Sequence, residues 1–353
     1  MYDKIFVWDN YSDQPHVIKD KAFKKKMKKK FIFDQFKILF TFILTFPIAT
    51  LFMKLFTAKK YDKNQFFGMS VNLDKGIEQV QLIEELGVKN LLIRMPLNDI
   101  KNIDSYVEFA KSFGEDKSIL INILQDRENI DDEGLLLRNI EEVFRSFSSI
   151  TLEFQIGSTI NRTKWGFFST QEYLEFYKKI YDLRNEKFPD IILAGPSVID
   201  FEYHYTARAL FNSYDIKFDR LSSLLYVDRR GSPSNTQMGI FDTKNKVNLL
   251  YSLAKLSPKT TDDIYITEVN WPLSNTAPYA PTSEHECVSE ELYDKYMIDY
   301  FDIIKNTNKI RRVYWHQLIA AGYGLVDNRD GKIRKTKAFY SFKKMVSTID
   351  ENS

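Results

Sequence analysis

Residues 264–273 read IYITEVNWPL, a short β-branched and aromatic run that changes to polar residues at Thr267 and Glu268. An apolar run of this length, followed by polar residues and a proline, is typical of a buried strand. Seven further runs of this kind occur along the chain, and segments with helical periodicity separate them. Strands that alternate with helices in this way predict βαβ units and a parallel sheet.

The predicted strands are spread over residues 64–350. They are Phe66–Val71, Asn90–Arg94, Ser118–Ile123, Ile150–Ile156, Ile191–Ala194, Arg220–Val227, Ile264–Val269 and Arg312–Leu318. Eight strand–helix pairs favour a closed barrel over an open sheet, and no glycine-rich phosphate-binding loop follows any strand. We therefore predict one α/β domain over residues 64–350, a (β/α)₈ TIM barrel.

The segment before this domain has a different composition. Residues 19–30 contain eight lysines and one aspartate, a net charge of +7, whereas the whole chain carries +2. Residues 38–53 read ILFTFILTFPIATLFM without a charge, and with Leu55 and Phe56 they approach the roughly 20 residues that a membrane span needs. The composition predicts a basic N-terminal tail (residues 1–37) and a single transmembrane helix (residues 38–56). The alternatives are a buried amphipathic helix and a helix that lies in the membrane interface.

The lysines also predict an orientation for this helix. Because most of them precede the apolar run, the positive-inside rule places the N-terminus in the cytoplasm and the barrel on the periplasmic or extracellular side. Their position beside the apolar run favours contact with the anionic headgroups of a membrane. Without the lysine block the chain has a net charge of −5, which argues against a nucleic-acid partner.

Polar and aromatic residues gather where the predicted strands end, and TIM-barrel active sites lie at that end. A carboxylate among indole rings and amides suits a sugar, because aromatic faces pack on the ring while polar groups bind the hydroxyls. The candidates are Glu268 as the catalytic group and, for substrate binding, Arg94, Trp315, Trp271, Trp165, Asn161 and Gln317. No metal site is predicted, since the four histidines are scattered, and no cofactor is expected.

The order and spacing of these segments resemble the clan A glycoside hydrolases over about residues 66–346. The resemblance implies that Glu268 in ITEVNW is the catalytic nucleophile and that Arg94 in IRMPL supports it. It also implies that Trp315 in YWHQL forms the floor of the sugar site. The phrases at residues 172–198 and 335–345 are similar to those that follow strands 4 and 8 in that clan.

The general acid/base of that clan has no counterpart here. The clan ends strand 4 with Asn-Glu, whereas QIGSTINR (residues 155–162) places Ser158 and Thr159 at these positions. Retaining hydrolysis needs two carboxyl groups about 5–5.5 Å apart, and a threonine hydroxyl is too weak an acid to replace one. Loops after strands 5 and 7 offer other candidates, namely Asp200, Glu202, His204, Glu284 and Glu286.

Two functions fit these observations. The first is a membrane-anchored glycoside hydrolase or transglycosylase that acts on O-glycosidic bonds of an envelope or cell-surface glycan. The second, favoured by Thr159, is a catalytically impaired carbohydrate-binding barrel in polysaccharide or lipopolysaccharide assembly. Enzymes of other chemistry on the same barrel stay open, because a fold alone does not define a function.

Overall fold

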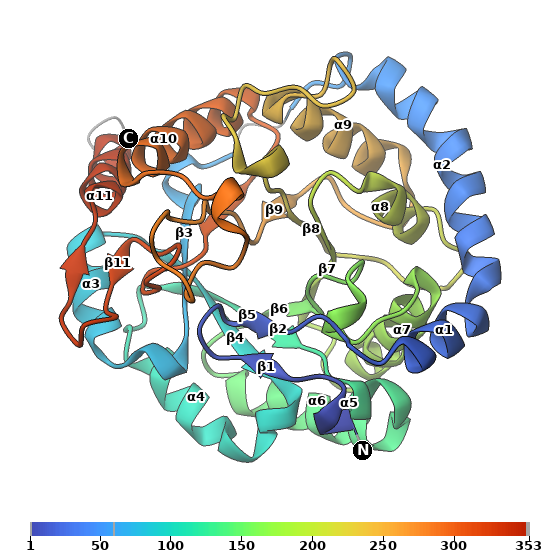
Figure 1. Ribbon diagram of the computed structural model, residues 1–353. Helices are drawn as coiled ribbons and strands as arrows, with labels where there is room; N and C mark the ends of the chain where they lie inside the picture. Colours follow the sequence, from blue (N-terminus) through green and yellow to red (C-terminus); the bar gives the residue numbers. More distant parts are fainter. Residues whose placement is uncertain (1, 59–60, 351–353) are drawn as a thin grey trace.

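The computed structural model describes residues 2–58 and 61–350, and its centre is a closed barrel of parallel strands (Figure 1). The strands follow one another around the barrel in chain order, and the last one, β10, pairs with the first, β3. They are β3 (Phe67–Val71), β4 (Asn90–Pro96), β5 (Ser118–Leu124), β6 (Glu153–Ile156), β7 (Ile192–Ile199), β8 (Arg220–Leu224), β9 (Ile264–Ile266) and β10 (Arg312–Trp315). The predicted TIM barrel is confirmed.

The strand ends differ from those expected. β9 stops at Ile266 and β10 at Trp315, so Glu268 and Gln317 follow their strands instead of ending them. The chain stays tied to its neighbours beyond these points, because the His316 amide donates to the Val269 carbonyl at 3.0 Å. The polar residues that follow Ile266 and Trp315 therefore lie in loops on the rim of the barrel, held by backbone hydrogen bonds.

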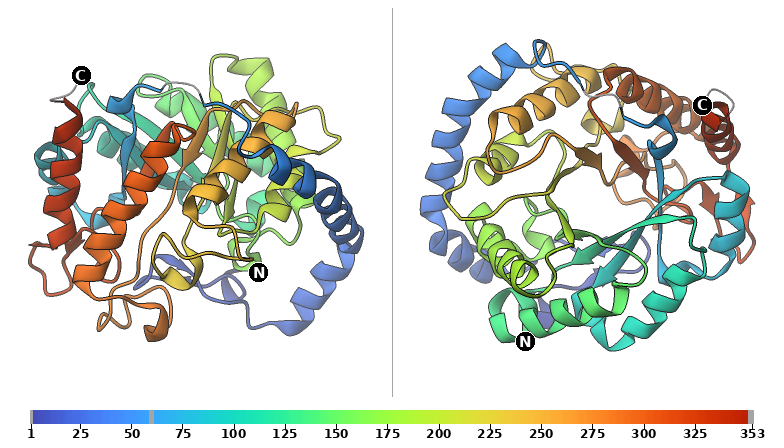
Figure 2. Two further views of the ribbon diagram at one scale, coloured as in Figure 1. Left: turned by 90° about the horizontal axis from the view of Figure 1, so that it is seen from above. Right: turned by 180° about the vertical axis from the view of Figure 1, so that it is seen from behind.

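Helices surround the barrel and cover its outer face (Figure 2). They are α3 (Glu78–Leu86), α4 (Ile103–Lys111), α5 (Arg127–Asp131), α6 (Glu133–Phe147), α7 (Thr170–Lys187), α8 (Tyr203–Leu210), α9 (Thr243–Leu256), α10 (Glu290–Thr307) and α11 (Lys337–Asp350). A cap marks the start of α7, because the Ser169 hydroxyl accepts the Glu172 amide at 3.0 Å. The Glu172 carboxylate in turn accepts the Phe168 amide at 2.9 Å.

The interior of the barrel is filled by side chains. Its apolar layer consists of Leu92, Leu120, Tyr265 and Tyr314. At the N-terminal end of the strands the Tyr265 hydroxyl donates to Glu153 at 3.0 Å, and Arg312 donates to the Tyr314 hydroxyl at 3.0 Å. The barrel interior is therefore closed, and Glu153, at the start of β6, lies at the end opposite to the C-terminal rim.

Helix α2 (Ile32–Phe52) lies along the flank of the barrel, against α8 and α9 (Figures 1 and 2). Among the helices in the described part of the chain, it is the one long and apolar enough to cross a membrane. Polar contacts hold it to the barrel: the buried Asp34 carboxylate accepts Arg208 Nε at 2.9 Å and the Gln171 amide at 2.8 Å. Farther along, the Ser252 hydroxyl donates to the Ala49 carbonyl at 2.8 Å.

The outer side of α2 is apolar and exposed. Its residues include Ile32, Phe33, Phe36, Leu39, Phe40, Ile43, Leu44, Ile48 and Leu51. The lysine-rich helix α1 (Lys21–Lys30) directly precedes it. We call the exposed residues just named the outer face of α2.

Residues 2–18, here called the arm, cross the mouth of the barrel (Figure 1). The arm contains a small hairpin of β1 (Trp8–Asp9) and β2 (Gln14–Pro15). The Trp8 ring meets Trp165 edge-on, with ring centroids 5.8 Å apart, and Gln14 Nε2 donates to the Pro281 carbonyl at 2.9 Å. The arm, part of the segment expected as a basic tail, thus packs on the barrel and adds residues to its rim.

Replacing Gly68 by alanine should lower the free energy of unfolding by about 1–3 kcal/mol. A Cβ atom at this position in β3 would lie 2.5 Å from Cδ1 of Tyr314, whose ring is buried inside the barrel. Urea denaturation followed by circular dichroism measures the change. Gly134→Ala in α6 is the matched control, because the nearest atom there, 3.3 Å away, ends the flexible Arg138 side chain. Equal stability of Gly68→Ala and the unmodified protein would contradict the packing of Tyr314 across β3.

Candidate active site

A cavity of about 230 Å³ opens at the C-terminal end of the barrel, and Glu268 and Arg94 both line it. Arg94 Nη2 donates to Glu268 Oε2 at 2.8 Å, and the Tyr226 hydroxyl donates to Glu268 Oε1 at 2.7 Å. Both oxygens of this largely buried carboxylate are therefore held in place. The structure brings together two residues that are 174 positions apart in the sequence.

Tyr226 was not among the residues predicted for the site. It lies two residues beyond the end of β8, and the sequence alone placed it inside the strand Arg220–Val227. Burial and the negative charge of Glu268 raise the pKa of Tyr226 well above its ordinary value. Its hydroxyl consequently stays protonated and donates to Glu268. The sequence did contain one signal for Tyr226, a tyrosine at the end of a predicted strand, where the residues of a barrel site are expected.

The charge of Glu268 is set by competing effects. Burial by itself would raise the pKa of this carboxyl, but His316, Arg94 and the hydrogen bonds from Tyr226 and Arg94 lower it below its ordinary value. Burial and the nearby Arg94 in turn lower the pKa of His316 to about 4. At neutral pH His316 is therefore uncharged, so Arg94 and Tyr226 keep Glu268 ionised there.

Trp315 and Trp271, predicted to face the sugar, do not line this cavity. Both indoles are fully buried and stacked on each other, with ring centroids 5.9 Å apart. Trp315 Nε1 donates to the Tyr293 hydroxyl of α10 at 2.9 Å. Because successive side chains of a strand point to opposite faces, Tyr314 faces the barrel interior and Trp315 faces the helices. The expected tryptophan floor is not formed by these two residues.

Thr159 lines the cavity with Glu268, in the loop that follows β6. Two further carboxylates line it, Asp200 and Asp13, and both are already paired with cations. Asp200 accepts Arg162 at 2.7 Å, and Asp13 accepts Lys75 at 2.7 Å. Each is thus engaged as the partner of a cation and not as a free acid opposite Glu268.

The other loop residues considered as acids have different surroundings. Glu202 accepts Arg162 at 2.6 Å and Asn161 at 2.7 Å, outside the cavity lining. The His204 ring packs against Phe42 of α2, and burial lowers the pKa of its imidazole. Glu284 accepts the Asn275 amide at 3.0 Å, and neither it nor Glu286 lines the cavity.

The arm supplies part of the site, which the sequence did not indicate. Asp13 Oδ2 accepts Gln317 Nε2 at 2.9 Å, and Gln317 also binds Asn72. Arg94 Nη1 donates to the Asp13 carbonyl at 3.3 Å. The predicted substrate-binding residue Gln317 is therefore buried behind Asp13 and occupied by it.

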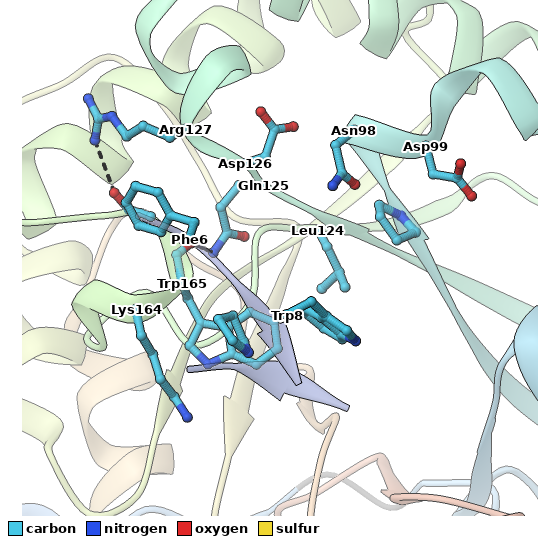
Figure 3. A pocket seen from close by; sticks show the side chains of 13 residues that line it. Phe6, Trp8, Asn98, Asp99, Leu124, Gln125, Asp126, Arg127, Lys164 and Trp165 are labelled. Atoms are coloured by element: carbon cyan, nitrogen blue, oxygen red, sulfur yellow. Dashed lines mark hydrogen bonds between the residues drawn. The ribbon is translucent and has the colours of Figure 1, made fainter. Parts of the chain in front are cut away.

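Trp165 lies between two cavities. It lines the cavity that contains Glu268, here called the catalytic cavity because catalysis is proposed for it below, together with Arg94, whose guanidinium carbon is 5.9 Å from the indole centroid. It also lines a neighbouring cavity of about 290 Å³, where Trp8 lies beside it (Figure 3). Asn161, in contrast, turns away from Glu268, since its side chain binds the Ile199 backbone and Glu202. Of the predicted binding residues, Arg94 and Trp165 line the catalytic cavity.

Within residues 2–58 and 61–350, no three side chains of histidine, cysteine, aspartate or glutamate come together as a metal site would need.

No family model and no curated protein matches the sequence. Among solved structures, a family 1 β-glucosidase from Thermotoga maritima aligns with a TM-score of 0.60 and 12% identity, covering 82% of this chain and 99% of that one. β-Glucosidase complexes from the same organism with deoxynojirimycin and with castanospermine align with TM-scores of 0.59, the same identity and the same coverage. The chain has a glycosidase-like fold. At 12% identity the similarity establishes the barrel and no particular activity.

Tyr226→Phe should raise the pKa of Glu268, because it removes a hydrogen bond to the charged carboxylate. A carboxyl group with a lowered pKa loses its charge as the pH falls through that pKa, so the variant should lose its charge at a higher pH. The same change narrows, from its acidic side, the pH range in which the ionised carboxylate stabilises the folded state. Carbon NMR titration of labelled glutamate measures the pKa without a substrate. The control is Tyr251→Phe, whose hydroxyl contacts Thr57 and Asp262 instead. An identical titration in both variants would contradict the contact.

Proposed function

We propose that this protein is a glycoside hydrolase or transglycosylase that acts on O-glycosidic bonds of an envelope or cell-surface glycan, with Glu268 as its nucleophile. The observation that carries the proposal is the Glu268 carboxylate, held at both oxygens at the mouth of the barrel. An ionised carboxylate in this position can attack an anomeric carbon. Sugar-like ligands in the structurally similar β-glucosidases support a carbohydrate ligand here.

Each of the three residues has a distinct role in this reaction. One Glu268 oxygen attacks the anomeric carbon while the bond to the leaving oxygen breaks. Arg94 and Tyr226 orient the carboxylate and keep it ionised until the attack. Thr159, at the position that corresponds to the general acid of the clan A glycoside hydrolases, supplies no proton at neutral pH. Substrates whose leaving groups need no proton are therefore the ones that this site converts best.

Glu268→Gln should abolish turnover of activated aryl glycosides, since an amide is not a nucleophile. The unmodified protein should form a covalent adduct with an activated 2-deoxy-2-fluoro glycoside, and peptide mass spectrometry should locate the adduct on Glu268. Thr159→Glu serves as a second comparison, because general acid catalysis typically contributes about 10²–10⁴-fold. It should help poor leaving groups more than good ones.

Full activity of Glu268→Gln on every substrate would rule out the nucleophile. If the protein binds glycans but neither turns over nor forms the adduct, the catalytically impaired binding barrel is the correct account. Fast turnover of unactivated glycosides by the unmodified protein would instead reveal an acid other than Thr159.

We also propose that α2 attaches the protein to a membrane. The helix has 21 residues and an apolar outer face, and the lysines of α1 beside it suit anionic headgroups. If α2 lies in the membrane surface, α2 and the arm can both keep their contacts with the barrel of the same molecule. A transmembrane helix with a cytoplasmic N-terminus and an external barrel would break the Asp34–Arg208 and Gln14–Pro281 contacts. We therefore favour the surface arrangement.

Replacing Phe36, Phe40 and Leu44 by serine should abolish flotation of the protein with anionic vesicles. These side chains are 62%, 65% and 51% exposed, so their replacement removes apolar contact with lipid and little packing. Tyr340→Ser on α11, at a side chain 57% exposed, is the matched control. Each α1 lysine changed to glutamine should weaken binding to anionic vesicles about fivefold at low salt. Resistance to carbonate extraction with a protease-protected N-terminus would instead establish a transmembrane helix.

A further inference from the structure

Lys164 is a cation of the catalytic cavity that has no carboxylate partner in the described part of the chain. It lines the same cavity as Glu268, and its ammonium group donates to Gln14 Oε1 of the arm at 2.6 Å. Burial and the neighbouring Arg162 lower the pKa of this lysine, and the negative charges of Glu268 and Asp9 oppose them only in part. An anion bound beside Lys164 would offset both effects and stabilise its charged form.

The other cations at this rim are compensated by carboxylates. Arg94 pairs with Glu268 at 2.8 Å and Lys75 with Asp13 at 2.7 Å. Arg162 binds both Asp200 and Glu202, and Arg230 lies 3.5 Å from Asp200. Lys164 is therefore the place where the rim can accept additional negative charge.

Lys164 also lies on the side from which a leaving group would depart. It belongs to the loop after β6 that also carries Thr159. In the clan A glycoside hydrolases that this sequence resembles, the position of Thr159 holds the acid that protonates the leaving oxygen. The positive charge of the Lys164 ammonium group can stabilise a leaving group that departs as an anion and needs no proton.

A groove of about 800 Å³ extends this basic character beyond the cavity. It shares Arg162 with the cavity, and Ile160, Phe167 and Phe168 form an apolar wall. The lysines that line it come from α1 and are Lys21, Lys24, Lys25, Lys28 and Lys29. The groove can hold an anionic group together with an apolar substituent.

We propose that the substrate of this site is a sugar linked at its anomeric carbon to a substituted phosphate, as a phosphodiester or diphosphate, with Lys164 binding the departing phosphate or diphosphate ester. The inference rests on the proposed function, because it requires Glu268 as the nucleophile. Glu268 forms a bond to the anomeric carbon, the bond between that carbon and the phosphate oxygen breaks, and its electron pair stays on the phosphate oxygen.

The released phosphate monoester has a second pKa of about 6, so it leaves as a dianion without an acid. Water or an acceptor hydroxyl then attacks the anomeric carbon, and the electron pair of the ester bond returns to Glu268. The proton of the attacking hydroxyl passes to the released phosphate dianion. The site thus needs no second carboxyl group.

The test compares two leaving groups on the same panel of sugars: glycosyl fluorides and glycosyl diphosphates. Fluoride departs without a general acid, so it reports on Glu268, whereas the diphosphate also reports on Lys164. The measured quantity is the ratio of kcat/KM for diphosphate to kcat/KM for fluoride. We expect Lys164→Met to lower this ratio about 10–100-fold, Lys164→Arg to restore most of it, and Lys178→Met on the outer side of α7 to leave it unchanged.

The outcomes separate the two proposals. Turnover of neither substrate class would overturn the proposed function and this inference with it. Turnover of fluorides with no turnover of diphosphates, or a ratio insensitive to Lys164→Met, would overturn the inference alone. Diphosphates carried on a nucleoside and on an alkyl chain are assayed separately. A preference for the alkyl form that is lost when the α1 lysines become glutamine assigns the phosphate to a lipid, and a preference for the nucleoside form assigns it to a nucleotide.

Discussion

The hydrogen bonds between β3 and β10 close the sheet, and the candidate site depends on that closure. Val313 pairs with Phe67 and Trp315 with Met69, which joins the last strand to the first. Closure removes the free edges of the sheet and places every C-terminal strand end on one rim. Arg94, Tyr226 and Glu268 come from β4 and from the loops after β8 and β9, and on this rim they reach hydrogen-bond distance.

The rim balances its charges in pairs, and this balance decides what chemistry it can perform. A buried carboxylate would ordinarily take up a proton, but the contacts of Glu268 with Arg94 and Tyr226 keep it ionised. Asp13 and Asp200 neutralise further cations and are not placed as free acids. What is left is the proposed nucleophile Glu268, no carboxyl group at Thr159, and Lys164, which forms no ion pair within the described residues. This combination would suit leaving groups that are already anionic.

The N-terminal segment links the site to the flank of the barrel. The arm contributes Asp13 and Gln14 to the cavity, α1 lines the adjoining groove, and α2 packs on α8 and α9. These elements follow one another directly in the chain, so a change in how α2 is seated would be transmitted to Asp13 and its contacts with Lys75 and Gln317. Attachment of α2 to a membrane would therefore fix the groove and the catalytic mouth relative to the lipid surface.

The sequence by itself determined the barrel, the order of its strands and the placement of Arg94 and Glu268 toward its C-terminal rim, although Glu268 follows β9 and does not end it. Alternating apolar runs and helical periods report local burial, and a parallel sheet built from them has few possible closures. Sequence could not orient Trp315, because one position along a strand exchanges the barrel interior for the helix layer. Nor could it show that Trp271, in the loop after β9, stacks on Trp315. It also could not place the arm, Tyr226 or Lys164 beside Glu268. These contacts join residues that are far apart in the chain, and only the closed tertiary structure brings such residues within reach of one another.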